Sequence, residues 1–256
     1  MRRFLLFAMI AAVAAAGCAG EATRDPRADL DRGRAAFDAE QWQEAVDFLS
    51  LGLRANPTAH DRGQVHYLRG QALLRLDRRR EARADFDRAI AAQPGQPTDA
   101  FARIAIGNLF FEDGYDRQAV LTYAPVLKDP PSEIPLDRVL LRLAISLQRL
   151  GKWPQADRYL AYLIRSYPRS AAAAEARRRY RADSFSVQTG AYASRTSAIG
   201  EAHRLRAAGF EPHIDVAVRE QERLHAVRVG KARTYAEAAT LARRVQGAGF
   251  PALVVP

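Results

Sequence analysis

The sequence predicts two folded parts: an α-helical solenoid over residues 26–169 and a small α+β domain over residues 183–256, in the order βαββαβ. Two internal repeats support this prediction. The first part repeats every 37 residues, and the second part aligns with itself at an offset of 40. A further helix over residues 170–182 is expected to close the solenoid, because the last apolar face of a stacked array needs a cover.

The composition excludes several classes of protein. The chain has 256 residues, of which 48% are apolar and 27% are charged, and this balance is typical of globular proteins. Its single cysteine, Cys18, excludes an intramolecular disulfide framework and a cysteine-rich zinc site. The net charge of +10 is spread along the sequence without a basic stripe, which argues against nucleic-acid binding.

The N-terminus predicts export. Two arginines precede an uncharged apolar run from Phe4 to Ala16, which is too short to span a bilayer as a helix. A positive leader, a short apolar run and small residues at its end are typical of a secretory signal peptide. The run ends at small residues followed by Cys18, and this pattern resembles the lipobox of bacterial lipoproteins.

That resemblance implies that residues 1–17 are the signal peptide, that Cys18 is the lipid attachment site and that residues 18–25 form a tether. Ala19 after the cysteine then favours the outer membrane, with the protein facing the periplasm. Several acyl chains on one residue give stable anchoring. The alternative is ordinary cleavage near Gly20, which would discard Cys18.

The 37-residue repeat predicts a pair of helices in each copy. Its four columns hold a small residue, an alanine, a large apolar residue and a proline: Gly33, Gly70, Gly107, Ala144; Ala45, Ala82, Ala119, Ala156; Leu49, Phe86, Tyr123, Leu160; Pro57, Pro94, Pro131, Pro168. The small residue lets a partner helix approach, and the alanine and the large residue share one helix face. Proline stops the second helix. One pair cannot bury its apolar face alone, so neighbouring pairs must stack.

These columns resemble the tetratricopeptide repeat (TPR). The resemblance implies a groove that binds a protein or peptide, here an envelope protein. By the repeat register, the groove would contain these residues: Leu30, Arg34, Phe37, Tyr67, Gln71, Ile104, Asn108 and Phe111. The alternative is a packed scaffold in which the same residues merely face inward.

Alternation of apolar and polar residues assigns the two faces of the C-terminal sheet. Two equivalent βαβ halves predict four antiparallel strands, with both helices on one face and the first and third strands in the centre. Val187 and Val227 must face the helices, so Gln188 and Arg228 face the open side near its middle. An amide and a guanidinium suit the hydroxyl, acetamido and carboxylate groups of sugars. The alternative is that both are ordinary solvated sheet residues.

The same segment resembles the SPOR (sporulation-related repeat) domain. The resemblance rests on these motifs: Val187-Gln188-x-Gly190-Ala191-Tyr192, Val227-Arg228-Val229-Gly230, Gly209-Phe210 and Gly249-Phe250. It implies binding of peptidoglycan glycan strands stripped of stem peptides, which are enriched at division septa. The sugar chain would cross the open face, with these contacts: Ser186, Gln188, Tyr192, Leu224 and Arg228.

The chain departs from that family at three places. Ala191 replaces a serine, the segment 224–226 lacks the usual aromatic and arginine, and Lys231 replaces a proline. Arg228 points to the same face as the missing arginine and is expected to replace it.

The sequence contains no motif for catalysis. Its histidines lack paired metal spacing, and it has no nucleophile elbow, phosphate loop or dinucleotide fingerprint. We therefore expect a protein that is not an enzyme, with no cofactor or metal, acting in cell division or wall remodelling. The alternative is an outer-membrane assembly or envelope-integrity scaffold that its SPOR domain only tethers to the wall. RNA binding, which the βαββαβ order also allows, is disfavoured by the signal peptide.

Overall fold

A computed structural model describes residues 26–256 apart from 55–57, 93, 129, 131–133, 135, 220 and 221. The expected signal peptide, the tether with Cys18, and two of the column prolines, Pro57 and Pro131, therefore lie outside the described residues. Among the helices that are described, none is long and apolar enough to cross a membrane.

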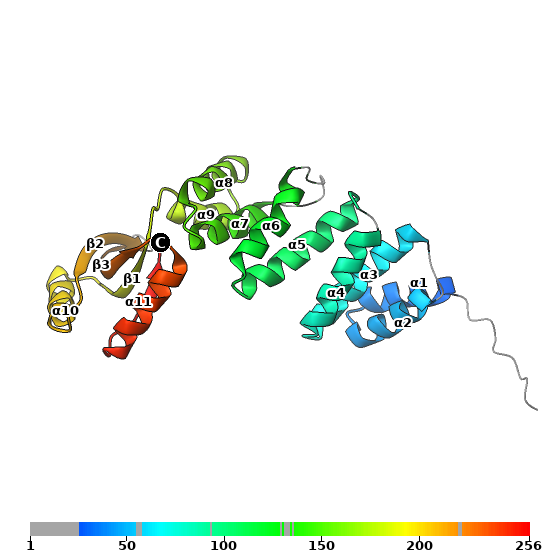
Figure 1. Cartoon of the computed structure of the whole chain (residues 1–256), viewed down its shortest axis with the longest axis horizontal. Helices are drawn as coiled ribbons and strands as arrows, with labels where there is room; N and C mark the ends of the chain where they lie inside the picture. The colour runs from blue at the N-terminus through cyan, green and yellow to red at the C-terminus, as the bar shows by residue number, and fades with distance from the viewer. Residues whose placement is uncertain are drawn as a thin grey trace, which may run out of the picture.

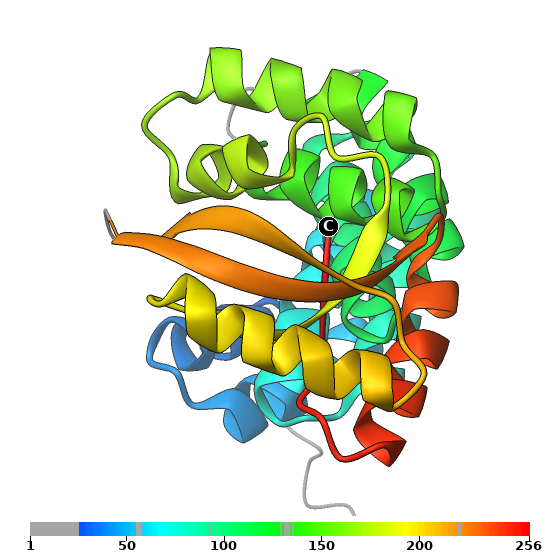
Figure 2. The ribbon, with the colours of Figure 1, turned by 90° about the vertical axis from the view of Figure 1, so that its left-hand side faces the viewer.

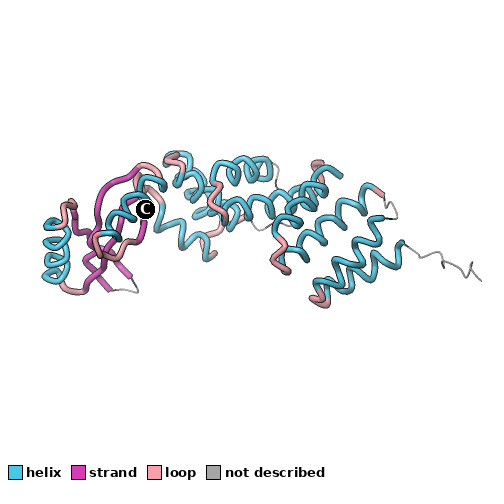
Figure 3. The backbone as a smooth tube through the Cα atoms, turned by 60° about the horizontal axis from the view of Figure 1, so that its bottom comes forward, coloured by secondary structure: helices cyan, strands magenta, loops and turns pink. Residues whose placement is uncertain are grey.

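The described chain is elongated, with helices stacked along its length and a sheet at the C-terminal end (Figures 1 and 3). The stacked helices come in four antiparallel pairs: α1 (Pro26–Asp38) with α2 (Trp42–Arg54), α3 (Ala59–Arg75) with α4 (Arg79–Ala92), α5 (Pro97–Glu112) with α6 (Asp116–Lys128), and α7 (Asp137–Arg149) with α8 (Trp153–Ser166). The predicted α-solenoid is confirmed.

The small and large columns of the repeat meet inside each pair. A Cβ atom on Gly70 would lie 2.7 Å from the ring of Phe86, and one on Gly107 would lie 2.5 Å from the ring of Tyr123. Both rings are fully buried, so neither can move aside. Glycine is therefore required by the close approach of the two helices, as the repeat predicts.

A short helix, α9 (Ala171–Arg179), follows the fourth pair. It begins where the Ser170 hydroxyl accepts a hydrogen bond from the backbone N–H of Ala173. Its end differs from the prediction, which extended the helix to residue 182. Arg181 adopts a φ of +64°, and its N–H donates to the Asp157 carboxylate at 3.1 Å. A residue in the left-handed region cannot continue a helix, so the chain turns toward the sheet earlier.

The C-terminal domain has the predicted βαββαβ order. Its elements are β1 (Phe185–Tyr192), α10 (Arg195–Ala207), β2 (Pro212–Arg219), β3 (Glu222–Ala232), α11 (Tyr235–Gly247) and β4 (Leu253–Val255). The four strands are antiparallel in the order β2-β3-β1-β4, so β1 and β3 are central. Val187 and Val227 pack against Leu205 of α10 and Val245 of α11. Both helices thus cover one face, which leaves the other face open (Figure 2).

The solenoid and the sheet domain are joined by a tryptophan. Trp153, at the start of α8, is 6% exposed, and its ring centroid lies 4.8 Å from that of Phe185 on β1. The Trp153 indole N–H donates to the backbone carbonyl of Arg233 at 2.9 Å. Arg149 of α7 lies over the ring of Tyr235, the first residue of α11, at 5.3 Å. These contacts hold the two parts in one orientation.

Candidate functional site

One row of side chains crosses the open face of the sheet. Gln188 on β1 pairs directly with Arg228 on β3, and the row continues to Leu253 on β4 and to His213 on β2. Directly paired residues of antiparallel strands point to the same side. The four side chains therefore form a continuous strip, and Gln188 and Arg228 occupy its middle as the sequence predicts.

The two central side chains keep unused hydrogen-bonding groups. Within the part of the chain that is described, no hydrogen bond engages the Gln188 amide, and the Nε–H of Arg228 is buried without an acceptor. The Arg228 guanidinium has one distant partner, because its Nη1 lies 3.7 Å from the Asp215 carboxylate. A buried donor without an acceptor costs free energy, so an acceptor supplied by a ligand would be bound favourably.

A cavity of about 320 Å³ adjoins this row on the open face. Ser186, Arg228 and Asp215 line it from the sheet, and Asp183 and Lys231 line it where the chain enters the domain. Lys231 and Asp183 form an exposed ion pair at 3.1 Å, which contributes little to stability. The cavity mixes donors and acceptors, as a site for a polar ligand requires.

The predicted contacts divide between the two faces. Ser186 lies two residues before Gln188 on β1, and Leu224 lies four residues before Arg228 on β3, so the alternation of each strand places both on the open face. Tyr192 does not lie with them. It pairs with His225 and packs against the helix-side core, because Thr189 is an extra residue between the Gln188–Arg228 and Gly190–Val227 pairs. This β-bulge reverses the alternation after Gln188.

Sequence reasoning missed the two ends of the row, His213 and Leu253. Leu253, on the edge strand β4, is 61% exposed. His213 is separated from Asp215 by one residue, and its Nε2 lies 3.4 Å from that carboxylate. The same alternation that places Asp215 on the open face could have placed His213 beside it.

A second candidate site lies on the solenoid. A cavity of about 390 Å³ between α3, α5 and α7 brings together four of the predicted groove residues: Tyr67, Gln71, Ile104 and Asn108. We call it the inner groove. The Gln71 amide donates to the Tyr67 hydroxyl at 3.1 Å, and burial raises the pKa of Tyr67. The Asn108 carbonyl accepts from the Tyr123 hydroxyl at 2.7 Å, which leaves its amide N–H groups for a ligand.

The other predicted groove residues lie outside this cavity. Arg34 contacts Asp31 and Gln64 in the first two pairs, and Phe37 packs edge-on against Trp42. Phe111 lies under the guanidinium of Arg149 at 4.9 Å. Leu30 is 5% exposed and belongs to the core, so its predicted place in the groove is wrong. Its side chain fills the space over Gly52.

Comparison with known families agrees with the division into a solenoid and a sheet domain. Residues 181–256 match the model described as SPOR domain, and residues 138–170 match one described as tetratricopeptide repeat. The chain contains a SPOR domain. The repeat match covers the pair α7 and α8, next to the junction. SPOR domains and tetratricopeptide repeats are binding modules, so the coarse function is peptidoglycan binding together with protein interaction.

Solved structures match parts of the chain. Pseudomonas aeruginosa pilF is 18% identical with a TM-score of 0.51, over 60% of this chain and 66% of that one, and supports the solenoid fold. YrrB, a TPR protein with an unusual peptide-binding site, is 21% identical with a TM-score of 0.49, over 60% of this chain and 74% of that one. The peptidoglycan-binding domain of the B. subtilis lytic enzyme CwlC is 31% identical with a TM-score of 0.24, over 28% of this chain and 85% of that one. No curated protein matches the chain.

Proposed function

We propose that this protein binds peptidoglycan glycan strands across the open face of its SPOR domain and holds a protein partner in the inner groove. The observation that carries the proposal is the row through Gln188 and Arg228, whose amide and buried Nε–H have no partners within the described chain. Both groups suit acetamido and carboxylate oxygens. Removal of a stem peptide exposes such a carboxylate on the glycan, so the protein prefers peptide-free strands.

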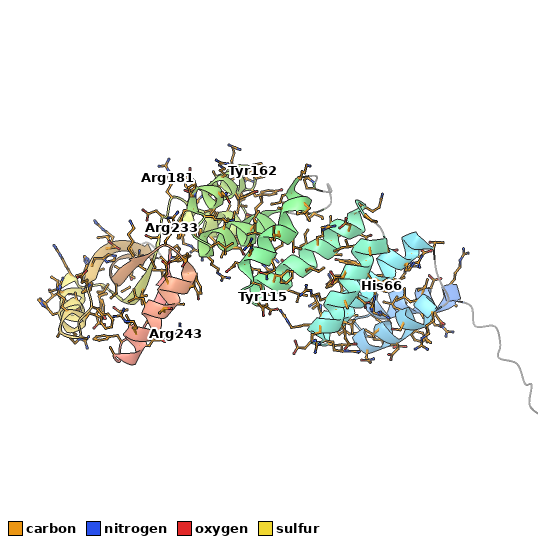
Figure 4. The ribbon with its side chains drawn as sticks, in the orientation of Figure 1. His66, Tyr115, Tyr162, Arg181, Arg233 and Arg243 are labelled. Atoms are coloured by element: carbon orange, nitrogen blue, oxygen red, sulfur yellow. The ribbon has the colours of Figure 1, made fainter. Side chains whose placement is uncertain are left out.

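Binding to isolated sacculi tests this proposal. The chain from residue 18 onward is sedimented with sacculi before and after amidase treatment. Binding should increase after treatment, and Gln188→Ala and Arg228→Ala should each weaken it by about tenfold, because each removes one or two hydrogen bonds. Gln246→Ala and Arg243→Ala are matched controls on exposed positions of α11, which covers the other face (Figure 4). Equal binding by all four variants would contradict the proposal.

The proposed location is the periplasmic face of the outer membrane, with a lipid on Cys18. The lipobox-like sequence before that residue supports it. Cys18→Ser should release the protein from the membrane fraction without changing its affinity for sacculi. A membrane-bound Cys18→Ser variant would argue against the anchor.

The proposed cellular role is to bring the inner-groove partner to septal glycan during division. The fixed junction at Trp153 supports this role, because a partner on the solenoid is then held at a set distance from the wall. A fluorescent fusion should concentrate at septa and lose that pattern when residues 184–256 are deleted. A septal pattern that survives the deletion would favour a scaffold role in which the SPOR domain only tethers the protein.

A further inference from the structure

A second groove, which we call the outer groove, lies on the other side of α7 from the inner groove. Val120 and Ala124 of α6 form one wall, Tyr159 and Tyr162 of α8 form the other, and Leu140 and Leu143 of α7 lie in the floor. The cavity measures about 640 Å³ and is mostly apolar. Arg142 of the same helix α7 lines the inner groove instead, so the two grooves occupy different faces of the solenoid.

The floor of the outer groove belongs to the solenoid core, whereas its walls reach solvent. Leu140 and Leu143 are 2% and 1% exposed, but Tyr162 is 45% exposed at the upper edge of the solenoid in Figure 4. Apolar surface gathered in a hollow and edged by polar groups marks an interaction site more often than scattered apolar residues do.

Basic side chains lie in and beside the outer groove. Arg158 lines it, Lys128 lies one helical turn beyond Ala124, and Arg165 lies over the Tyr162 ring at 6.0 Å. Within the described residues, none of the three has a carboxylate partner. Elsewhere on the solenoid, by contrast, arginines such as Arg79 and Arg103 are paired with carboxylates. An occupant of the outer groove should therefore carry negative charge beside its apolar side chains.

The shape of the floor indicates a helical occupant. Leu140, Leu143 and Leu147 all line the groove, and they span two turns of α7, or about 10 Å. A helix lying along this floor would place apolar side chains at i, i+3 or i+4, and i+7 into it, as helix-in-groove recognition does. We propose that the outer groove binds an amphipathic, acidic helix of a protein partner. This site is independent of the glycan-binding face and of the inner groove.

A designed peptide tests the outer groove. The probe is a fluorescently labelled, stapled helix with leucines at spacings of three and four residues and glutamates on its other face. A second peptide replaces every glutamate with lysine. The anisotropy of each is measured against the chain from residue 18 onward. The acidic peptide should bind saturably, and the basic one about tenfold more weakly or not at all.

Three groove variants and one matched control locate the binding. Ala124→Glu places a carboxylate in the wall, Arg158→Glu reverses the charge and Tyr162→Ala removes an exposed ring; each should weaken acidic-peptide binding by about tenfold. Ala124 and Tyr162 are exposed, so these changes leave the fold intact. Ala174→Glu adds the same charge at an exposed position of α9 and should bind as wild type.

Other occupants are separate outcomes that overturn the proposal. Equal binding of the two peptides, no saturable binding, or full binding by Ala124→Glu would each show that the groove does not select an acidic helix. If sedimentation velocity showed a dimer that Ala124→Glu dissociates, the groove would be assigned to a second copy of this chain. Vesicles containing anionic phospholipid, if bound by wild type and not by Arg158→Glu, would assign it to a lipid surface.

Discussion

Gln188 and Arg228 face each other across the two central strands of the SPOR sheet, and within the described chain neither the Gln188 amide nor the Nε–H of Arg228 has a hydrogen-bond partner. The two residues occupy equivalent positions in the two βαβ halves, 40 residues apart. An internal repeat has thus placed an amide opposite a guanidinium on an exposed face. A fold that buries Arg228 Nε–H without an acceptor gives up stability, and ligand binding is the physical reason we propose for that loss.

The planar arrangement of the N–H donors of Arg228, more than its charge, should determine the affinity for glycan. Arg228→Lys keeps the charge but removes the planar set of donors, including Nε–H. We expect it to lower the affinity for a peptide-free glycan oligosaccharide by about tenfold while leaving the free energy of unfolding unchanged or slightly higher, because a buried donor without an acceptor is removed. Calorimetric titration and urea denaturation measure the two effects. Wild-type affinity in Arg228→Lys would mean that only charge matters.

Trp153 belongs to the solenoid, but its contacts should stabilise the sheet domain. Trp153→Ala removes a buried ring from the contact with Phe185 and is expected to cost ~3–5 kcal/mol. Trp153→Phe keeps a ring and loses the hydrogen bond to Arg233, at a cost of ~1 kcal/mol.

Hydrogen exchange followed by mass spectrometry locates the Trp153 effect. Amides of β1 and α11 should exchange faster in Trp153→Ala, whereas those of α1 to α4 should not change. Unchanged protection of β1 would mean that the junction is only a surface contact.

Close packing of the helix pairs should make glycine-to-alanine substitutions destabilising there, and a glycine in open space provides the control. Gly70→Ala and Gly107→Ala would drive a methyl group into the buried rings of Phe86 and Tyr123, and each should cost ~1–3 kcal/mol. Gly200→Ala, in α10, meets nothing within 4 Å and should be stabilising by ~0.5–1 kcal/mol. Urea denaturation compares the three. Stabilisation by Gly70→Ala would contradict the packing described for α3 and α4.

A buried carboxylate should make the solenoid sensitive to acid. Asp85 of α4 is 1% exposed and accepts hydrogen bonds from Arg69 at 2.6 and 2.7 Å and contacts His66 at 3.0 Å. Burial alone would raise the pKa of Asp85, but the hydrogen bonds from Arg69 and His66 outweigh it and lower this pKa from 3.8 to about 2.

The sign of the Asp85 effect follows from that lowered pKa. The carboxylate stabilises the fold above the pKa of the unfolded chain, and this contribution is lost as the pH falls through the folded value. Asp85→Asn should therefore cost ~2 kcal/mol at neutral pH, with the difference from wild type shrinking between pH ~4 and pH ~2. Urea unfolding at several pH values measures this difference in the free energy of unfolding between wild type and Asp85→Asn. A difference that does not change with pH would show that Asp85 acts by packing alone.

Periodic patterns predicted most of the fold and half of the site. The contacts of Gly70 with Phe86 and of Gly107 with Tyr123 repeat along the chain, so their spacing was visible in the sequence. Alternation placed Gln188 and Arg228 correctly because their faces are set by period two. Tyr192 was misplaced because a bulge inserts one residue without any periodic signal, and Thr189 does not differ from an ordinary strand residue.

The junction could not be predicted for a different reason. Trp153 occupies an ordinary position in the repeat, and its partner carbonyl belongs to a residue 80 positions later. That contact depends on how the folded solenoid packs against the folded sheet domain, and no local sequence pattern indicates this packing. The outer groove likewise appears only when α6, α7 and α8 are placed side by side.

We propose that one glycan strand crosses the open face over Gln188 and Arg228. The most direct test is titration of the isotope-labelled chain, from residue 18 onward, with a peptide-free glycan oligosaccharide, monitored by side-chain and backbone NMR shifts. We predict that the Gln188 amide and the Arg228 Nε–H shift together with the backbone of His213 and Leu253, while α10 and α11 do not change. Shifts confined to the helices, or an unchanged Gln188 amide, would show that the glycan does not cross the open face.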